Sequence, residues 1–453
     1  MATPNRQVLE SNLNNFDETI RRDALAALEV LSSTADAHVT QNFNMHAHSF
    51  FSYNAHEWSP SRIAWEGKKL KLYSMALCDF DLLDGLEEFL AAGRLLALRA
   101  AVHLETRAFM PSFATQELNS PGEPGVTYIM ACAFPAMPDP GTPAHKFLKH
   151  LRDSAAGRNA ERVQRVNAAI PAIAIDIQRD LLPLTPSRCP TERHIVRAYV
   201  NAAEKVMPDP TVRAEFWAGL AKKTPAQITQ LEKNDRPAFD DLVRSALLKK
   251  GAPGYTLPTP ETFPDAGNFC KFALAADAIP CATWLDGTLS AEADPSLLLD
   301  RYTDIGCAAL NIIPDRNWNL SDPAEKATKV ANLGAIVREA VKRDLPVNIG
   351  TELNKITNPF ADQLNKPELA PHAAVFTAGA QVMVGHTVLA RYANAPLLGA
   401  RAKAEFKTTA ERNAFYAKIG ALPPLDQNLA EHLCDLGPDK AYAALVDEAR
   451  KAG

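Results

Sequence analysis

Apolar and polar positions alternate along this chain in two different rhythms. Between residues 5 and 36, apolar residues recur at the three- and four-residue spacing of an amphipathic helix: Val8, Leu9, Leu13, Phe16, Ile20, Leu25, Leu28 and Leu31. From residue 38 onward, short apolar runs typical of strands are separated by amphipathic stretches. The pattern predicts a helical N-terminal extension over residues 1–37, followed by repeated strand–helix units.

The strand–helix units occupy two separate parts of the chain. Residues 38–145 contain the strand patterns HVTQNFNMHAH, KLYSMALCDFD, LRAAVHLETRAF and VTYIMACAF, and residues 266–372 contain PCATWLDG, CAALNIIP and LPVNIGTE. Repeated units of this kind predict a parallel sheet covered by helices, which is either a barrel or a doubly wound sheet.

Two further regions are helical. Strand patterns are absent from residues 146–265, and proline-rich segments at 135–145 and 251–267 flank this region, as expected where a chain leaves and re-enters a compact layer. Residues 373–453 again show helical periodicity. We expect a helical insertion between the two halves of the sheet and a helical C-terminal region.

The amino-acid composition and charge indicate a globular protein and exclude several other classes. The 453 residues are 47% apolar and 22% charged with a net charge of -5, which is typical of a globular chain. Lysine and arginine form no basic block, so we expect no nucleic-acid partner, and without an apolar run of about 18 residues or a signal peptide we expect no membrane association. Seven cysteines stand singly without a CxxC pair, which favours buried thiols in a reducing compartment and predicts a cytoplasmic protein.

The sharpest chemical feature is the pair His46 and His48 in the first strand pattern. Side chains alternate between the faces of a strand, so both imidazoles point the same way and suit a divalent metal ion. Several other strand patterns end in an acid: Asp79, Asp81, Glu105, Asp286, Asp315 and Glu352. The C-terminal ends of parallel strands build the active site in α/β folds, so some of these acids are expected to meet the histidines, while others only cap the following helix.

These motifs follow one another in an order that resembles the PHP (polymerase and histidinol phosphatase) family. The resemblance rests on MHAHSFFSYNAHEWSPSRIAWEGKKLKLYSMALCDFDLLDGLEEF, HLETRAF, RNAERVQRVNAAI, TERHIVRAYV and VKRDLPVNIGTELNK, and covers roughly residues 38–360. It implies an α/β fold, a distorted (β/α)7-type TIM-like barrel with a helical insertion and helical N- and C-terminal extensions.

The resemblance also implies a metal centre. His46 and His48 match the family's HxH ligands, Glu105 its bridging glutamate and His194 the histidine of its insertion, while Glu352 stands where the family has an aspartate. These five residues are expected to hold one divalent ion, or two, with Zn²⁺, Mn²⁺ and Fe²⁺ as candidates.

Two departures limit that centre. Phe80 replaces a ligand histidine in the second strand, and Asn354 replaces the family's final histidine. A complete three-metal cluster is not expected, because neutral or apolar side chains cannot neutralise further divalent cations.

The function implied is metal-dependent hydrolysis, specifically of a phosphoester, on a small anionic substrate through a metal-activated water. Asp79 is a candidate general base or orienting residue, and Arg107, Arg193 and Lys355 are candidates for binding a phosphate. Two alternatives stay open: a degenerate barrel that binds a small molecule without turnover, and a metal-dependent lyase or isomerase.

Overall fold

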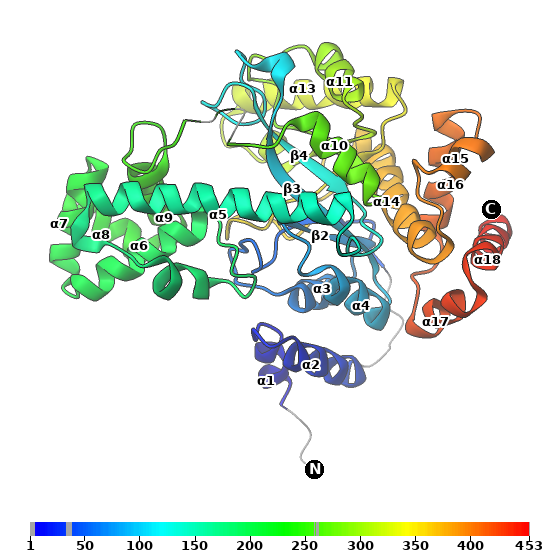
Figure 1. Cartoon of the computed structure of the whole chain (residues 1–453), viewed down its shortest axis with the longest axis horizontal. Helices are drawn as coiled ribbons and strands as arrows, with labels where there is room; N and C mark the ends of the chain where they lie inside the picture. Colours follow the sequence, from blue (N-terminus) through cyan, green and yellow to red (C-terminus); the bar gives the residue numbers. More distant parts are fainter. Residues whose placement is uncertain (1–4, 33–38, 258, 260–261, 453) are drawn as a thin grey trace.

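Seven strands form one sheet that curls into a nearly closed barrel in the computed structural model, which describes residues 5–32, 39–257, 259 and 262–452 (Figure 1). The strands follow one another in chain order around the sheet: β1 (Asn44–Ala47), β2 (Ser74–Phe80), β3 (Arg99–Phe109), β4 (Val126–Cys132), β5 (Ile279–Trp284), β6 (Ala309–Ile312) and β7 (Val347–Ile349). Nearly all their residues are buried, which explains their continuous apolar runs. The predicted TIM-like α/β barrel is confirmed.

The prediction of an all-parallel sheet is wrong at β4. This strand pairs antiparallel with both β3 and β5, while the other strand pairs are parallel. Parallel neighbours need a long crossover connection, usually a helix. Only residues 110–125, with the single-turn helix η1 (Pro111–Phe113), join β3 to β4, so the chain turns back directly.

The two ends of the sheet meet beside the paired histidines. The Glu352 backbone N–H donates to the His46 carbonyl at 2.7 Å, and the His48 N–H donates to the Glu352 carbonyl at 2.9 Å. A Cβ atom at Gly350 would lie 2.3 Å from the His46 nitrogen, so only glycine permits this close approach. The segment after β7 is therefore fixed against the backbone of His46 and His48.

Helices cover the outside of the barrel: α3 (Pro60–Lys69), α4 (Leu86–Leu96), α10 (Ala266–Ala275), α11 (Pro295–Asp304), α13 (Pro323–Lys342) and α14 (Ala373–Ala393). Within the described residues, one helical segment, Ala370–Ala393, is long and apolar enough by composition to cross a membrane, but more than half of its most apolar window is buried in the protein. A Cβ atom at Gly379 would lie 1.9 Å from the Val347 carbonyl, which shows how closely α14 packs on β7. This contact is that of a core helix.

The region between β4 and β5 is helical, with its own hydrophobic core. It comprises α5 (Pro143–Ala169), α6 (Glu192–Val206), α7 (Pro210–Ala221), α8 (Pro225–Asn234) and α9 (Arg236–Leu248). The N-terminal part of α5 contributes Leu148 and Leu151 to the barrel core, and its C-terminal part contributes Val163 and Val166 to the second core. One continuous helix thus links the two cores (Figure 1).

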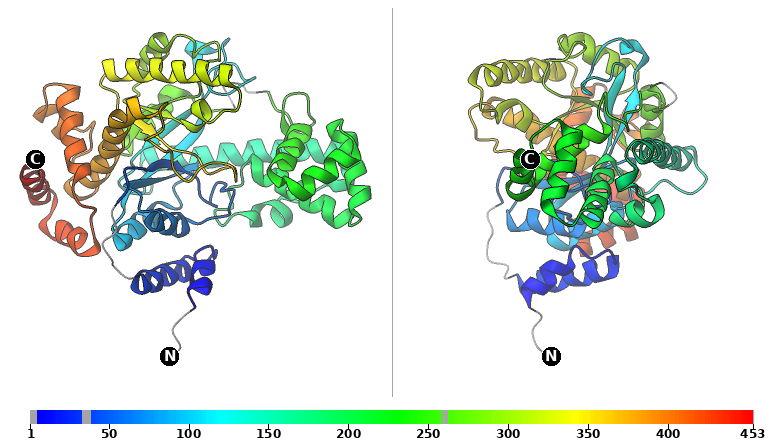
Figure 2. Two further views of the ribbon diagram at one scale, coloured as in Figure 1. Left: turned by 180° about the vertical axis from the view of Figure 1, so that it is seen from behind. Right: turned by 90° about the vertical axis from the view of Figure 1, so that its left-hand side faces the viewer.

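Further helices lie at both ends of the chain. The hairpin α1 (Arg6–Asn12) and α2 (Glu18–Leu31) buries Leu9, Leu13, Leu25 and Leu28 in the barrel core, whereas Phe16 and other predicted stripe residues are exposed. The expected boundary between residues 37 and 38 lies outside the described residues. The C-terminal helices α15 (Ala400–Glu405), α16 (Thr409–Ala421), α17 (Gln427–Leu436) and α18 (Pro438–Lys451) lie at the opposite end of the molecule from the insertion (Figure 2).

All seven cysteines carry free thiols, and six of them are buried. Buried free thiols agree with a reducing compartment. A cytoplasmic location stays a prediction.

Candidate metal centre and cavity

Three of the predicted ligands converge at one end of the barrel. The Glu105 Oε2 atom lies 3.5 Å from the Nε2 atoms of both His46 and His48, and one donor atom from each residue lies within 4.8 Å of the others. His46 lies in β1 and His48 follows it directly, so strand alternation turns both rings to one side. Glu105 faces them from β3, where the register places it beside Phe80 at the end of β2.

The free atoms of these side chains fit a metal ion. His46, His48 and Glu105 are at most 2% exposed, yet His46 Nε2, His48 Nε2 and Glu105 Oε2 make no hydrogen bond. Buried polar atoms are normally paired, because leaving them unpaired costs about 1–3 kcal/mol each. Two imidazoles and one carboxylate aimed at a common point are a donor set for a divalent cation.

Burial sets the charge of the ligands. Burial lowers the pKa of His48 to about 3, helped by the neighbouring His46, so this imidazole is neutral and able to ligate. Burial raises the pKa of Glu105. Burial also acts to lower the pKa of His46, but the Glu105 carboxylate outweighs it and the pKa is raised. Glu105 is the one acidic side chain among the three donors.

Phe80 closes one side of the centre. Its ring stacks on His48 with centroids 4.5 Å apart and an interplanar angle of 15°, and it lies 6.2 Å from the ring of Tyr128 on β4. The phenyl ring supplies no donor atom where the PHP-like pattern has a histidine, and it fixes the orientation of His48. The arrangement of donors accordingly suits one ion.

Glu352 lies beside the centre, but its carboxylate has other partners. The Glu352 Oε2 atom accepts hydrogen bonds from Arg316 Nη2 at 2.8 Å and from Asn354 Nδ2 at 3.1 Å. Burial opposes ionisation, yet Arg316 and His46 hold the pKa of Glu352 down at about 2. Among the described residues, the three-donor group contains neither Glu352 nor His194, so ligation by Glu352 stays a prediction.

His194 lies in the first turn of α6, in the insertion. Its Nδ1 atom accepts a hydrogen bond from the Thr191 backbone N–H at 3.0 Å, which closes the N-terminal cap of that helix. Its ring lies 5.5 Å from that of Tyr53, and burial lowers its pKa to about 3. The structure thus gives His194 a capping contact, and its proposed ligand role stays a prediction.

Asp79 is buried behind the metal ligands. Its carboxylate accepts hydrogen bonds from the Ser49 backbone at 2.8 Å, the Ser49 hydroxyl at 2.7 Å and the Ser52 hydroxyl at 2.6 Å. Ser52 in turn lies 3.5 Å from His48 Nδ1. Burial raises the pKa of Asp79 to about 6 in spite of these hydrogen bonds. The carboxylate holds the loop after β1, which carries His48.

A cavity of about 540 Å³ opens between the metal centre and the helical insertion. Glu105, Phe80, Tyr128 and Glu352 line its barrel side. In the part of the chain that the structure describes, nine cationic side chains line it: Arg107, Arg158, Arg162, Arg193, Arg244, Lys249, Lys250, Arg316 and Lys355. The described carboxylates that line it are fewer: Asp81, Glu105, Glu123, Glu192 and Glu352. The cavity is therefore suited to an anionic ligand.

The three predicted phosphate-binding residues all face this cavity. Arg107 pairs with Glu123 at 2.9 Å and lies over the Phe263 ring, and Arg193 pairs with Asp241 at 2.6 Å. Lys355 follows Asn354 at the rim. Their contact with a substrate stays a prediction, because the two arginines also hold neighbouring carboxylates.

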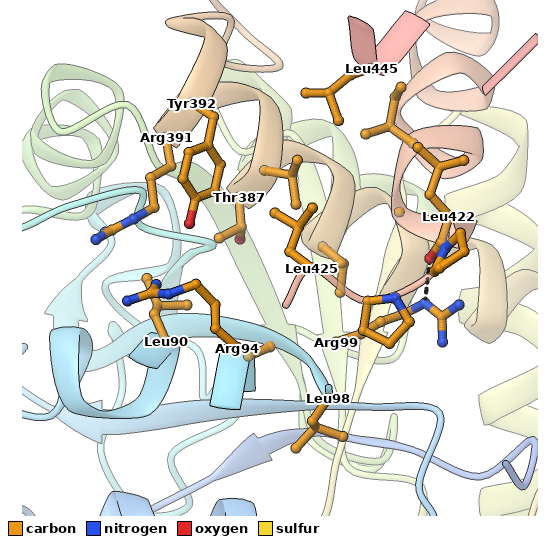
Figure 3. Close-up of a pocket in the computed structure, with 17 residues that line it drawn as sticks. Leu90, Arg94, Leu98, Arg99, Thr387, Arg391, Tyr392, Leu422, Leu425 and Leu445 are labelled. Carbon is orange, nitrogen blue, oxygen red and sulfur yellow. Dashed lines mark hydrogen bonds between the residues drawn. The ribbon is translucent and has the colours of Figure 1, made fainter. Parts of the chain in front are cut away.

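A second, smaller hollow lies between α4, the start of β3 and the C-terminal helices (Figure 3). Its volume is about 60 Å³, and Arg99 donates a hydrogen bond from its edge to the Leu422 carbonyl at 3.1 Å. The described residues that line it include no histidine, cysteine or carboxylate. It offers no acid–base or metal-ligating group.

The sequence interpretation missed several residues of the large cavity. Arg316 binds Glu352 beside the metal ligands, and Tyr128, Arg162 and Arg244 form part of the cavity wall. Arg316 could have been found from its place directly after the strand pattern CAALNIIP, where site residues gather in barrels. Arg162 lies within the quoted motif RNAERVQRVNAAI but was not assigned a role, whereas Tyr128 and Arg244 lie within strand and helix patterns that carry no motif.

Comparisons with known proteins give structural similarity only. No protein-family model matches the chain, and no curated protein matches it. A chain from Bifidobacterium adolescentis ATCC 15703, provisionally described as a metal-dependent phosphoesterase, is 18% identical with a TM-score of 0.47, over 74% of this chain and 96% of that one. An amidohydrolase from Chromobacterium violaceum, with bound sulfate and no metal, is 15% identical with a TM-score of 0.43, over 73% and 96%. At these levels of similarity, function has to be inferred from the side chains.

Proposed function

We propose that this chain is a hydrolase that uses one divalent metal ion held by His46, His48 and Glu105. The supporting observation is the convergence of three buried donors within 4.8 Å of one another. Nitrogen and carboxylate ligands suit Zn²⁺, Mn²⁺ or Fe²⁺. When bound, such an ion lowers the pKa of its water from 15.7 toward about 7 and polarises the bond to be cleaved.

The substrate in this proposal is a small anionic ester, with a phosphoester as the preferred class. The excess of cations over carboxylates around the cavity supports an anion, and Arg107, Arg193 and Lys355 supply donors that could orient it. Guanidinium groups match the geometry of phosphate oxygens particularly well. Phe80 and Tyr128 form a wall beside the ligands, which excludes water from that side of the bound ester.

Arg316 has a separate role in the proposal. Its guanidinium binds the Glu352 carboxylate at 2.8 Å. Glu352, and to a smaller extent Glu105, raise the pKa of Arg316, so the guanidinium stays charged at the edge of the centre. A fixed cation there is placed to bind the negative charge that develops on a departing or attacking oxygen.

Metal removal and reconstitution test the proposal. Protein purified without chelator, or reloaded with Zn²⁺, Mn²⁺ or Fe²⁺, is expected to hold about one ion per chain, because the described residues contain one such set of three donors. Hydrolysis of para-nitrophenyl phosphate should fall after dipicolinate treatment and return with metal. Mass spectrometry of the metal content and release of nitrophenolate measure the two quantities.

Other outcomes identify the alternatives. Metal content near zero after reloading with all three ions would contradict the proposal and favour a degenerate barrel that binds a small molecule, which the loss of ligands at Phe80 and Asn354 would explain. A metal-loaded protein that converts its substrate without consuming water would instead be a lyase or isomerase, which product analysis by mass spectrometry distinguishes.

Asp79→Asn is expected to retain the metal ion and to lower kcat/KM for hydrolysis by about 10- to 100-fold, the range typical of residues that orient metal ligands. The reason is that the amide oxygen can still accept hydrogen bonds from Ser49 and Ser52, but more weakly than the carboxylate. Steady-state kinetics together with metal analysis measure the effect.

The exposed variant Asp300→Asn on α11 serves as the matched control and should behave as wild type. A loss of about 100- to 10,000-fold with the metal retained would instead show that Asp79 itself transfers a proton in the reaction, since general acid–base catalysis contributes a factor in this range.

A further inference from the structure

Three cations of the helical insertion surround a single carboxylate at the cavity wall. Arg162 on α5 lies 3.1 Å from Glu192 Oε2, Lys249 at the end of α9 lies 3.2 Å from Glu192 Oε1, and Arg244 on α9 donates to the same Oε1 atom. All four residues line the cavity. We call Arg162, Glu192, Arg244 and Lys249 the Glu192 cluster.

The Glu192 cluster has more positive charge than its own carboxylate can neutralise. Arg162 is only 6% exposed, and its buried Nε atom makes no hydrogen bond. A buried cation without a matched partner costs several kcal/mol, so such groups are normally paired. Burial lowers the pKa of Arg162 and of Lys249, and the neighbouring cations contribute to this shift. The group that would balance the cluster is an anion in the cavity.

Among the described residues, the other acids on this side of the cavity do not supply that anion. Glu123, another carboxylate of the wall, accepts hydrogen bonds from Arg107 at 2.9 Å and from the Ser120 hydroxyl at 2.6 Å. Asp81 pairs with Arg158 at 3.5 Å. Each of these acids already has a cation of its own, so the excess charge around Glu192 remains directed at the cavity.

Tyr128 lies between the Glu192 cluster and the metal centre. It stands opposite Arg107 in the β3–β4 register, and its ring lies 6.2 Å from Phe80, which in turn stacks on His48. Arg107, Arg244 and Glu105 are all close enough to influence the pKa of Tyr128, which burial raises. The cavity therefore has a metal centre on its barrel side and a cationic cluster on its insertion side.

We propose that the Glu192 cluster is a second binding site, which takes an oxyanion group of the substrate remote from the bond that is cleaved. Arg162 and Arg244 present planar donors suited to two oxygens of one phosphate or carboxylate, and Lys249 adds a point charge. The substrate would then carry two anionic groups, one at the metal centre and one at the insertion. That the bound molecule is cleaved rests on the proposed hydrolase function, whereas anion binding by the Glu192 cluster does not depend on that function.

Anion binding to metal-free protein tests the site directly. Inorganic phosphate and succinate are titrated by calorimetry into chelator-treated protein that carries Glu105→Gln. Phosphate or succinate is expected to bind, and Arg244→Met or Lys249→Met should each weaken that binding by about 10- to 100-fold, the loss typical of one charge-assisted hydrogen bond. Both side chains are partly exposed, so these variants keep the fold.

The control Arg236→Met removes a cation from the same helix that pairs with Asp240 outside the cavity, and it should bind as the parent does. If phosphate binds more tightly than succinate, the group that the Glu192 cluster binds is a phosphate. If succinate binds more tightly, that group is a carboxylate. Equal affinities in the parent, Arg244→Met and Lys249→Met proteins, or no binding of either anion, would overturn the site.

Turnover separates this inference from the proposed function. With metal-loaded protein, Arg244→Met is expected to raise KM for 1,3-propanediol bisphosphate at least tenfold more than KM for para-nitrophenyl phosphate, with little change in kcat. An equal rise for both substrates would contradict a remote site. If wild-type protein hydrolyses neither ester, the proposed function fails, while the calorimetric comparison still decides whether the Glu192 cluster binds an anion.

Discussion

Replacing Glu105 with glutamine is expected to abolish metal binding and to lower hydrolysis at least about 1000-fold, because the water pKa shift supplied by a metal ion is lost with it. Glu105 is the charged donor of the group, and an amide cannot offset a divalent charge in a buried site. Metal content by mass spectrometry and hydrolysis of para-nitrophenyl phosphate at saturating metal measure the two effects.

The fold should survive this change. Glutamine has nearly the same shape as glutamate. Burial disfavours the charged form of Glu105, so the metal-free variant loses only the favourable charge contacts with His46 and Arg316, and burial already offsets them. Circular dichroism should match wild type. The control Glu87→Gln, at an exposed carboxylate of α4, should keep both metal and activity. Full metal content in the Glu105→Gln protein would refute the proposed ligand set.

Arg21→Ala is expected to destabilise the protein by about 3–5 kcal/mol, the cost of leaving one partner of a buried ion pair unpaired. Arg21 on α2 is 1% exposed and donates from Nε to Glu88 Oε1 at 2.9 Å, and a second bond joins its Nη2 to the other oxygen. Its guanidinium also lies 5.2 Å from the Phe50 ring. Guanidinium-induced unfolding followed by circular dichroism measures the loss.

The neighbouring residue provides a matched control. Arg22 is exposed, and Arg22→Ala should change the free energy of unfolding by no more than about 0.5 kcal/mol, as is usual at surface positions. The double variant Arg21→Met with Glu88→Gln should recover part of the lost free energy of unfolding, since it leaves no unpaired buried carboxylate at Glu88. A loss below about 1 kcal/mol for Arg21→Ala would show that the N-terminal hairpin is not held by this pair.

The approach of His46 and His48 could be predicted from sequence because their geometry is local: alternation along the backbone turns both rings to one side. The rule that strand ends build the site of an α/β barrel left six acids open, and the family resemblance implied Glu105 among them. The buried apolar runs likewise predict the strands, whereas the barrel was implied by the family resemblance. The antiparallel direction of β4 was missed, although the absence of a helical stretch between residues 110 and 125 was visible in the sequence.

The remainder of the site depends on contacts between distant residues. Position in a motif can identify His194 and Glu352 as candidate residues. It does not show that His194 Nδ1 accepts a hydrogen bond from Thr191, or that the Glu352 carboxylate binds Arg316. The Glu192 cluster is assembled from α5, α6 and α9, whose periodicity only predicts a helical region. Charged residues on such helices are mostly solvated, so nothing in the sequence distinguishes the residues of the Glu192 cluster from the other charged residues of the insertion.

The continuity of α5 has a consequence for substrate length. Its 27 residues span about 40 Å, anchored in the barrel core at one end and in the insertion core at the other. Arg158 and Arg162 project into the cavity from the middle of this span, between the two anchors. Because α5 is anchored in both cores, it holds the barrel wall and the insertion wall of the cavity at a constant separation. A ligand that contacts both walls must therefore match this separation, and we expect molecules too short to span the cavity to be bound at one end only.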